Sequence, residues 1–530
     1  MYIYDHQPSD STSRSRQQQR GPYLLDRTLS GFLQRGEYDQ QPLWADQGLG
    51  LSAEALSKNL SHFSLLPHFV EVNGKDVPLT PAAMDPGIYD GPEKYKIAPR
   101  LQDCLQAVMV MEKGKFRHIK VALVDLTKGP TRPEFAAFDH KQPIFAASIP
   151  KIAAMLAAHQ LLQDLRVASK RRATKGINDL FKLIRQDWAD TQRDPGGGAT
   201  PFTRGVSLRG KLVLVDGRLI PLVEPKAPRL EEVFEGTPKA FKFKSSGESK
   251  VQLDTLVDEF NLTPEKKEVR KAERELRAAP SDSMRKIAIR KLAEAKAKLA
   301  KAILTKRPQA QQELAALGFL ERMRVMAGGL TPASNFATST IVRDVGFLYI
   351  ASTLLQCGLH DPGRNGGLWL GTGYWPGTAW SGLRQFGGET PMSTAGSLAA
   401  FMTLLVQNKL VSPQASASMR SLIQIQPVNP THPTTSSWFE DGLSHHGSLD
   451  RVFAKIGFVR DGFHECAYIA RAVDCGKDRK GEKWELPLRY VAVGLGAKSA
   501  RELKQLIDDL DACIRANNRT TSCVRALKRA

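Results

Sequence analysis

The stretch 134–162 constrains the fold more than any other part of this sequence. A strand-like run at 134–138 is followed by a turn-rich link at 139–147 and then by a helical run from Lys151. Ser148 and Lys151 stand at this junction, in a Ser-x-x-Lys arrangement. One helical turn separates them, so the lysine amine is expected to reach the serine hydroxyl. Burial lowers the pKa of a lysine and lets it accept the proton of a serine, so the pair predicts a nucleophile and its base.

The spacing alone leaves a second interpretation open, because serine is favoured at helix N-caps and Ser148 could be an ordinary cap. The same spacing recurs at Ser283 and Lys286, within a Lys/Arg-rich helical stretch where a solvated face is expected. The context of Ser148 must therefore decide between the two interpretations.

Three later segments supply this context. The first, 330–341, contains Ala333, Ser334 and Asn335 and leads into a helical stretch that ends near 359. The second, 389–413, is typical of a pair of helices. The third contains two strand-like runs, 452–459 and 465–473, joined near Asp461 and Gly462.

Taken in order, these segments resemble the serine β-lactamase and penicillin-binding-protein superfamily, with a class A-like layout over 98–165 and 311–515. That family carries Ser-x-x-Lys, then Ser/Tyr-x-Asn, then Lys-Thr/Ser-Gly. Ser148 and Lys151 match the first element, Asn335 the second, and Lys455 and Gly457 the third. The resemblance implies an α+β fold (an α/β sandwich): an antiparallel sheet flanked by helices, a helical subdomain, and an active site in the cleft between them.

The resemblance also implies roles for the matching residues. Ser148 is then the nucleophile and Lys151 its base, while Lys455 keeps the cleft positive and Asn335 holds a substrate amide. The backbone N–H groups of Ser148 and Phe458 would form an oxyanion hole. The expected reaction is acyl transfer through an acyl-serine, on a small or peptide-like amide or ester, with no cofactor and no metal.

Three departures from the family pattern weaken this expectation. Ala333 stands where the family has Ser or Tyr, although Ser334 could replace it as a substrate-binding hydroxyl. Ile456 occupies a second substrate-binding position, where Thr or Ser is usual. No glutamate lies between Asp361 and Gly388, so the usual base for deacylation is missing and efficient β-lactam hydrolysis is not expected. A serine esterase, amidase or peptidase remains the leading interpretation. The alternatives are a pseudoenzyme that serves as a binding protein, and an anion-binding protein that acts through the basic segment 166–310.

The charge is concentrated in one region. The chain has a net charge of +20, and 166–310 contains 33 Lys and Arg against 19 Asp and Glu, a net of +14. Such a basic segment could give weak affinity for anions or nucleic acid, or could be no more than a solvated helical face. Within it, 211–223 is typical of a hairpin and 254–304 of a helical pair that starts with Thr263 as N-cap, with Ile289, Leu292, Leu299 and Ile303 at core positions.

The remaining patterns concern compartment and domain limits. No secretory signal and no membrane-spanning run are visible, and the six cysteines lack metal-ligand spacing, so free thiols in a reducing, cytoplasmic compartment are expected. His445 and His446 could edge the cleft or lie on the surface. The domain organisation predicted is a disordered tail (1–40), an N-terminal extension (41–97), the hydrolase-like domain (98–165 and 311–515), the basic segment (166–310) and a basic C-terminal tail (516–530).

Overall fold

The computed structural model describes residues 68–88, 96–172, 174–191, 212–215, 218–221, 228–328, 332–361, 366–370, 392–425, 437–446, 449–459, 462–477 and 483–519. The predicted tail at 1–40 and the end of the C-terminal tail lie outside these residues. Among the described residues, no helix is both long and apolar enough to cross a membrane.

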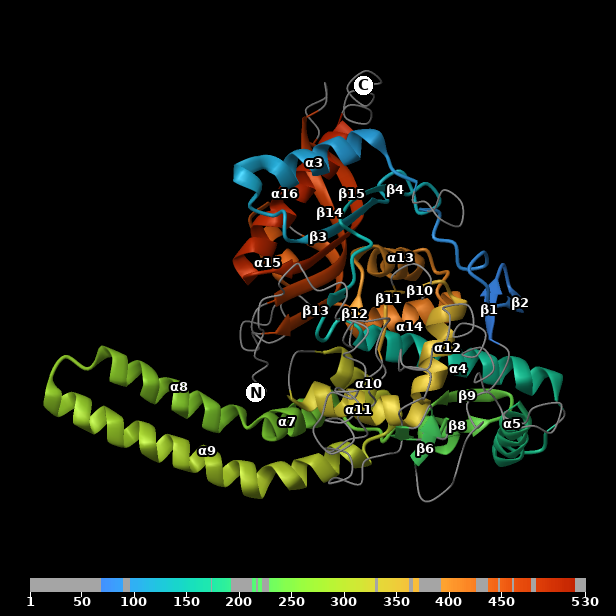
Figure 1. The fold of residues 1–530 in the computed structure, drawn as a ribbon, viewed down its shortest axis with the longest axis horizontal. Coiled ribbons are helices and arrows are strands. Elements are labelled where there is room, and N and C mark those ends of the chain that lie inside the picture. The colour runs from blue at the N-terminus through green and yellow to red at the C-terminus, as the bar shows by residue number, and fades with distance from the viewer. Residues whose placement is uncertain are drawn as a thin grey trace.

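A five-stranded antiparallel sheet forms one half of the molecule (Figure 1). Its strands are β3 (Lys120–Asp125), β4 (Glu134–Phe138), β13 (Leu449–Val459), β14 (Gly462–Lys477) and β15 (Lys483–Ala497), in the order β13-β14-β15-β3-β4. Strand β3, near the start of the described chain, pairs with β15, near its end, so the sheet joins segments that are far apart in the sequence.

Helices cover both faces of this sheet. One face packs against α3 (Pro99–Gly114), α15 (Trp438–Leu443) and α16 (Ala500–Arg519), whose apolar residues form one core cluster with it. The other face packs against α13 (Ala395–Val406), which belongs to a second cluster shared with the helical half. Alternation of side chains along each strand gives both faces apolar residues, which explains why two separate cores form.

The helical half is built around α4 (Lys151–Arg171), which is buried on nearly every side. Around it lie α10 (Phe319–Ala327), α11 (Pro332–Val345), α12 (Phe347–Gln356) and α14 (Pro413–Ile423). The predicted α+β class, an antiparallel sheet flanked by helices with a helical subdomain, is confirmed.

Several predicted elements are found with shifted ends. The strand predicted at 134–138 coincides with β4. Of the helix pair predicted at 389–413, only α13 lies within these bounds, because α14 begins at Pro413 and runs to Ile423; their N-caps are Thr394 and Ser412. The helix predicted at 151–162 continues to Arg171, so the limit proposed at 165 falls inside α4. Likewise, α16 extends to Arg519, so the domain limit predicted at 515 falls inside this helix.

The segment before the sheet is anchored through buried polar groups. The hairpin of β1 (Phe69–Val72) and β2 (Lys75–Pro78) follows His68, whose Nδ1 lies 2.6 Å from Asp164 Oδ2 on α4. His68 Nε2 lies 3.1 Å from Ser352 Oγ on α12, and the hydroxyl of Tyr349 donates to the same Asp164 carboxylate. A buried carboxylate with this many partners holds the extension on the helical half.

The basic segment 166–310 is not a separate outgrowth throughout. The hairpin predicted at 211–223 is confirmed as β6 (Leu212–Val215) and β7 (Arg218–Pro221). Further along lie α5 (Ile177–Thr191), α6 (Leu230–Val233), β8 (Phe234–Thr237), β9 (Ala240–Phe243) and α7 (Lys250–Asn261). Leu230, Phe234, Phe243 and Phe260 are buried in the same core cluster as α4 and α11. This packing argues against removing the whole segment without loss of the fold.

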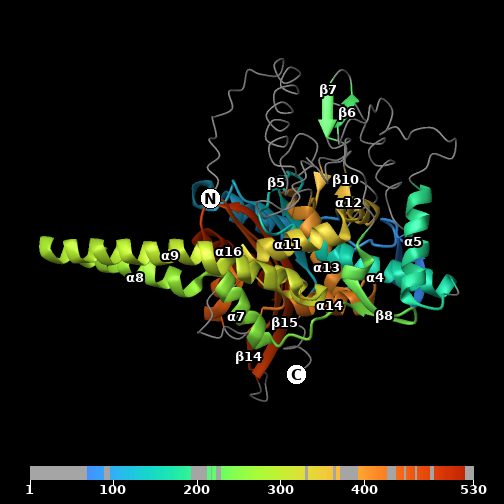
Figure 2. The same cartoon turned by 90° about the horizontal axis from the view of Figure 1, so that it is seen from below.

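The last part of the segment projects from the body as the antiparallel pair α8 (Thr263–Ala278) and α9 (Asp282–Ala316) (Figures 1 and 2). The predicted N-cap Thr263 is wrong by one residue, because Leu262, with φ +55°, occupies that position. Of the four positions predicted to form the core of this helical pair, two are confirmed and two are wrong. Leu292 and Leu299 are half-buried in the seam with buried Ala288, Ala295 and Ala302, while Ile289 and Ile303 are exposed.

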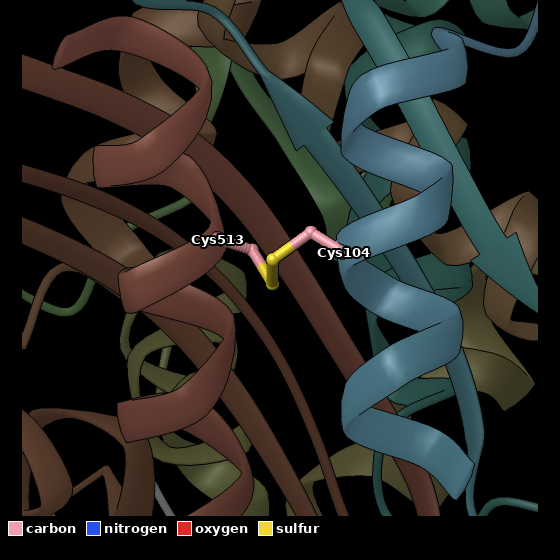
Figure 3. Close-up of a disulfide and its surroundings, with 2 residues drawn as sticks. All are labelled: Cys104 and Cys513. Carbon is pink, nitrogen blue, oxygen red and sulfur yellow. A yellow bond between two sulfur atoms is a disulfide. The ribbon is translucent and has the colours of Figure 1, made fainter. Parts of the chain in front are cut away.

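The cysteine prediction is also wrong in part. Cys104 on α3 and Cys513 on α16 form a disulfide across a sequence separation of 409 residues (Figure 3). Cys357 and Cys466 are free and buried, and Cys523 lies outside the described residues. Disulfides persist in oxidising compartments, so this bond counts against the reducing compartment expected from the sequence.

Candidate active site

Ser148 lies in a tight turn between β5 (Ile144–Phe145) and α4. The preceding Ala147 has φ +51°, a left-handed conformation that costs energy for a residue with a Cβ. The N-cap of α4 is Pro150, and no side chain caps the helix, so the interpretation of Ser148 as an ordinary N-cap is wrong. Its side chain is buried, with 7% exposure.

The Lys151 amine is the centre of a buried cluster. It donates to Ser334 Oγ at 3.0 Å and to Asn335 Oδ1 at 2.6 Å, both on α11. The Ser334 hydroxyl in turn donates to the carbonyl oxygen of Met326 at 2.9 Å, which leaves its oxygen as the acceptor for Lys151. α4 and α11 therefore meet at a fixed amine with two defined acceptors.

The expected hydrogen bond between the Ser148 hydroxyl and the Lys151 amine is not formed. Their backbones are joined by a bond from Lys151 N–H to the Ser148 carbonyl at 3.4 Å. No hydrogen bond from another described residue to the Ser148 hydroxyl is present. Contacts of this kind are often long in a free enzyme and shorten when the substrate is bound.

Lys455 brings a second buried amine from the sheet. It lies on β13 with 3% exposure and donates to the carbonyl oxygens of Met326 and Ala327, at 3.4 and 3.1 Å. These carbonyls end α10, where the helix dipole is negative and favours a cation. Lys455 thus ties the sheet to the same stretch of α10 that receives Ser334.

Burial governs the protonation of both amines. It lowers the pKa of Lys151 well below its usual range, and the nearby positive charge of Lys455 lowers that pKa further. Burial also lowers the pKa of Lys455 to about 8. A lysine in this setting can be neutral near physiological pH, as a general base must be.

Gly457 sets the distance between β13 and the Ser148 turn. A Cβ on Gly457 would lie 2.4 Å from the carbonyl oxygen of Ala146 and 3.2 Å from the backbone nitrogen of Ile149. These are backbone atoms, which cannot yield as the end of a side chain can. Only glycine allows the strand to approach the turn this closely.

Phe458 presents its backbone N–H at the outer edge of the sheet. On this edge strand, the Val452 carbonyl accepts from Ile425 N–H at 3.0 Å, so it points away from β14. Backbone groups alternate in direction along an antiparallel strand, and the register with β14 is regular from Val452 to Val459. The Phe458 N–H therefore points to the same outer edge, next to the turn that Gly457 contacts.

Two other predicted positions lie away from this cluster. Ile456 pairs with Glu465 and shares the face of Ala454 and Val452, opposite to the face of Lys455. Ala333 is fully buried and donates its N–H to Asn261 Oδ1 at 3.1 Å. The exposed His445 lies 3.9 Å from Asp508 on α16, which favours the surface interpretation for that histidine.

The structure does not describe most of 361–388, the stretch that lacks glutamate, nor the turn at Asp461. Within the described ranges, no cluster of three or more His, Cys, Asp or Glu side chains could hold a metal ion.

Two parts of the cluster could not be found by motif. The carbonyls of Met326 and Ala327 carry no side-chain signal. The sequence predicts Ser334 as a possible substrate contact, but its hydroxyl is engaged between Lys151 and Met326. This bond depends on the packing of α10, α11 and α4 against one another.

Comparisons with known proteins give only distant similarities. No family model and no curated protein matches the chain. A beta-lactamase from Sphaerobacter thermophilus is 12% identical, covers 79% of this chain and 96% of its own, and has a TM-score of 0.33. A class A beta-lactamase from Mycobacterium abscessus is 10% identical over 79% of this chain and 99% of its own, with a TM-score of 0.34. PBP-A is 13% identical over 79% and 97%, with a TM-score of 0.32. Scores of this size carry no argument about function, which must come from the site itself.

Proposed function

We propose that this protein is a serine acyl hydrolase of β-lactamase-like fold that cleaves an amide or ester through an acyl-serine. The observation that carries the proposal is the buried Lys151 amine, held by Ser334 and Asn335 one turn from Ser148. Its lowered pKa makes the neutral form available, and Lys455 helps keep it so.

The geometry of the amine suggests how it acts. A neutral amine has two N–H groups and one lone pair, and Ser334 and Asn335 both accept from it. Its lone pair is then the basic site for the proton of Ser148. Attack of the Ser148 oxygen on the substrate carbonyl would pass that proton to Lys151, and Lys151 would deliver it to the leaving group as the acyl-serine forms.

The N–H groups of Ser148 and Phe458 are proposed to stabilise the negative oxygen that develops during attack. The outward direction of the Phe458 N–H and the close approach of Gly457 to the turn support this role. Each such donor is worth about 3 kcal/mol in the transition state. Asn335 and Lys455 are proposed to complete the site by fixing the amine and by keeping the cleft positive.

Covalent labelling tests the proposal. A fluorophosphonate probe should label the wild-type protein and Ser283→Ala, whose serine is exposed on α9, but not Ser148→Ala. Absence of labelling of the wild-type protein by several serine-directed probes would instead favour a pseudoenzyme, an interpretation that the open contact between Ser148 and Lys151 allows.

Slow turnover of β-lactams is a separate part of the proposal. Because no glutamate lies between Asp361 and Gly388, no carboxylate from that stretch is expected to activate water for deacylation. Any penicilloyl adduct should therefore persist for longer than a normal turnover. Nitrocefin hydrolysis at roughly 1–1000 per second, the ordinary range for enzymes, would contradict this expectation.

A further inference from the structure

The projecting pair α8 and α9 leaves apolar and basic side chains exposed together on one side of α9. Ile289, Ile303 and Leu304 have exposures of 53%, 41% and 76%. Ile289 and Ile303 fit a helix seam by sequence spacing, yet the seam with α8 uses Ala288, Ala295 and Ala302 instead. These large side chains are therefore left without a partner in the helical pair.

Unpaired cations accompany the apolar residues. Lys286, Lys296 and Lys301 are exposed on α9, and no described acidic side chain forms an ion pair with them. By contrast, the lysines next to the seam are neutralised from α8, in the pairs Lys291–Glu275 at 3.1 Å, Lys298–Glu268 at 3.5 Å and Lys306–Glu265 at 2.6 Å.

Acidic residues are scarce on this helix. Between 283 and 312 the sequence contains one, Glu294, and it pairs with Arg290 at 3.1 Å. The pair of helices as a whole, 263–307, has 15 Lys and Arg against 6 Asp and Glu, a net of +9. The outer side of α9 thus combines large apolar groups with positive charge that the protein itself does not neutralise.

We propose that the outer side of α9 docks on an anionic lipid surface. A helix that carries lysines beside exposed Ile and Leu side chains fits the boundary between headgroups and acyl chains. The lipid phosphates would neutralise Lys286, Lys296 and Lys301, and the acyl boundary would cover Ile289, Ile303 and Leu304. α9 runs along the outer edge of the molecule, with α8 between it and the sheet, so this side can approach a plane (Figure 1).

A second copy of the chain fits this surface poorly. Two α9 helices facing each other would bring many lysines together with a single glutamate on each, Glu294, which already pairs with Arg290, and such repulsion is destabilising. Nucleic acid would satisfy the cations but would leave the exposed Ile and Leu side chains without an apolar environment.

The experiment measures cosedimentation of the full-length protein with phosphatidylcholine vesicles, with and without phosphatidylglycerol. The wild-type protein should bind only the anionic vesicles. Neutralising Lys286, Lys296 and Lys301 to Gln should weaken binding on the order of 100-fold, since each lysine near a charged surface contributes about fivefold. Replacing Ile289, Ile303 and Leu304 by Gln should weaken it by about tenfold or more without any change in charge.

Matched variants control for the loss of net charge and for the loss of exposed apolar side chains at other places. Lys267, Lys271 and Arg274 are exposed on the side of α8 away from α9, and changing them to Gln removes the same net charge from the same pair of helices. They would lie about two helix diameters, roughly 20 Å, from the lipid, beyond the Debye length of about 8 Å, so binding should change little. Changing Val110, Leu183 and Val251 to Gln controls for the loss of exposed apolar groups elsewhere.

Three results would overturn the proposal. The first is no binding of the wild-type protein to anionic vesicles at low salt. The second is an equal loss of binding in the α8 and α9 charge variants, which would indicate net charge alone. The third is tighter binding to a short DNA duplex, or a dimer in solution, that the α9 variants abolish. Circular dichroism and thermal melting confirm that each variant is folded, and Ser148 labelling reports on the proposed active site independently.

Discussion

Gly457 offers a sharp test of how closely the sheet must approach the Ser148 turn. In Gly457→Ala, the new methyl group would lie 2.4 Å from the Ala146 carbonyl oxygen and 3.1 Å from a side-chain carbon of Ile149. Since the first contact is with backbone, the strand and the turn must separate by several tenths of an ångström. Overpacking of this kind costs about 1–3 kcal/mol of stability.

The effect on acylation should exceed the effect on stability. Moving β13 away from the turn also moves the Phe458 N–H relative to Ser148, and a misplaced oxyanion donor costs roughly 100-fold or more in rate. The assay is the second-order rate of fluorophosphonate labelling, measured beside urea unfolding. We expect labelling to slow at least 100-fold while the protein remains folded.

Gly494→Ala is the matched control, because Gly494 lies on β15 of the same sheet and faces only side-chain atoms of Leu503, Leu506 and Phe439, at 3.0 to 3.3 Å. It should lose stability modestly and keep its labelling rate. Gly457→Ala labelled as fast as the wild-type protein would refute the reasoning that the glycine sets the geometry of the site.

Three further predictions concern the framework. Asp164→Asn should cost about 3–5 kcal/mol of unfolding free energy, because the Asp164 carboxylate is fully buried among its partners. Asp76→Asn, which breaks a partly exposed pair with Lys170, should cost under about 1 kcal/mol. Urea titrations compare the two variants. Alkylation of the denatured, unreduced protein should leave Cys104 and Cys513 unmodified, and Cys104→Ser should lower stability by about 2–5 kcal/mol; modification of both Cys104 and Cys513 would contradict the disulfide. Replacing 267–304 with a short Gly/Ser linker should leave a cooperative melting transition, whereas replacing 170–308 should abolish it. A cooperative transition in the 170–308 deletion would show that the core assignment of α6, β8 and β9 is wrong.

Local patterns predicted the parts of the fold that depend on neighbours in sequence. The strand β4 and the helix that follows Ser148 each have a short-range physical cause, so they could be predicted. The limit at 165 failed because the change to a basic sequence at Arg166 falls inside α4, whose last turn contains Lys170 and Arg171.

Long-range contacts account for the errors. Heptad spacing could not distinguish a seam of Ile289 and Ile303 from one of Ala288, Ala295 and Ala302, because both sets recur with helical periodicity and only the packing against α8 selects one. Cys104 and Cys513 are separated by 409 residues, so no local pattern links them. The Ser334 bond to Lys151 likewise depends on how α11 meets α4.

The central claim is that Ser148 is acylated with a neutral Lys151 as its base, and the pH dependence of adduct formation tests it most directly. Only the neutral amine accepts a proton, so the rate of Ser148 acylation, followed by mass spectrometry, should rise with pH through the lowered pKa of Lys151 and then level off. Lys455→Met removes the positive charge that lowers this pKa, so the rising limb should move to higher pH. A rate independent of pH, an adduct on another residue, or a limb that does not move in Lys455→Met would contradict the account.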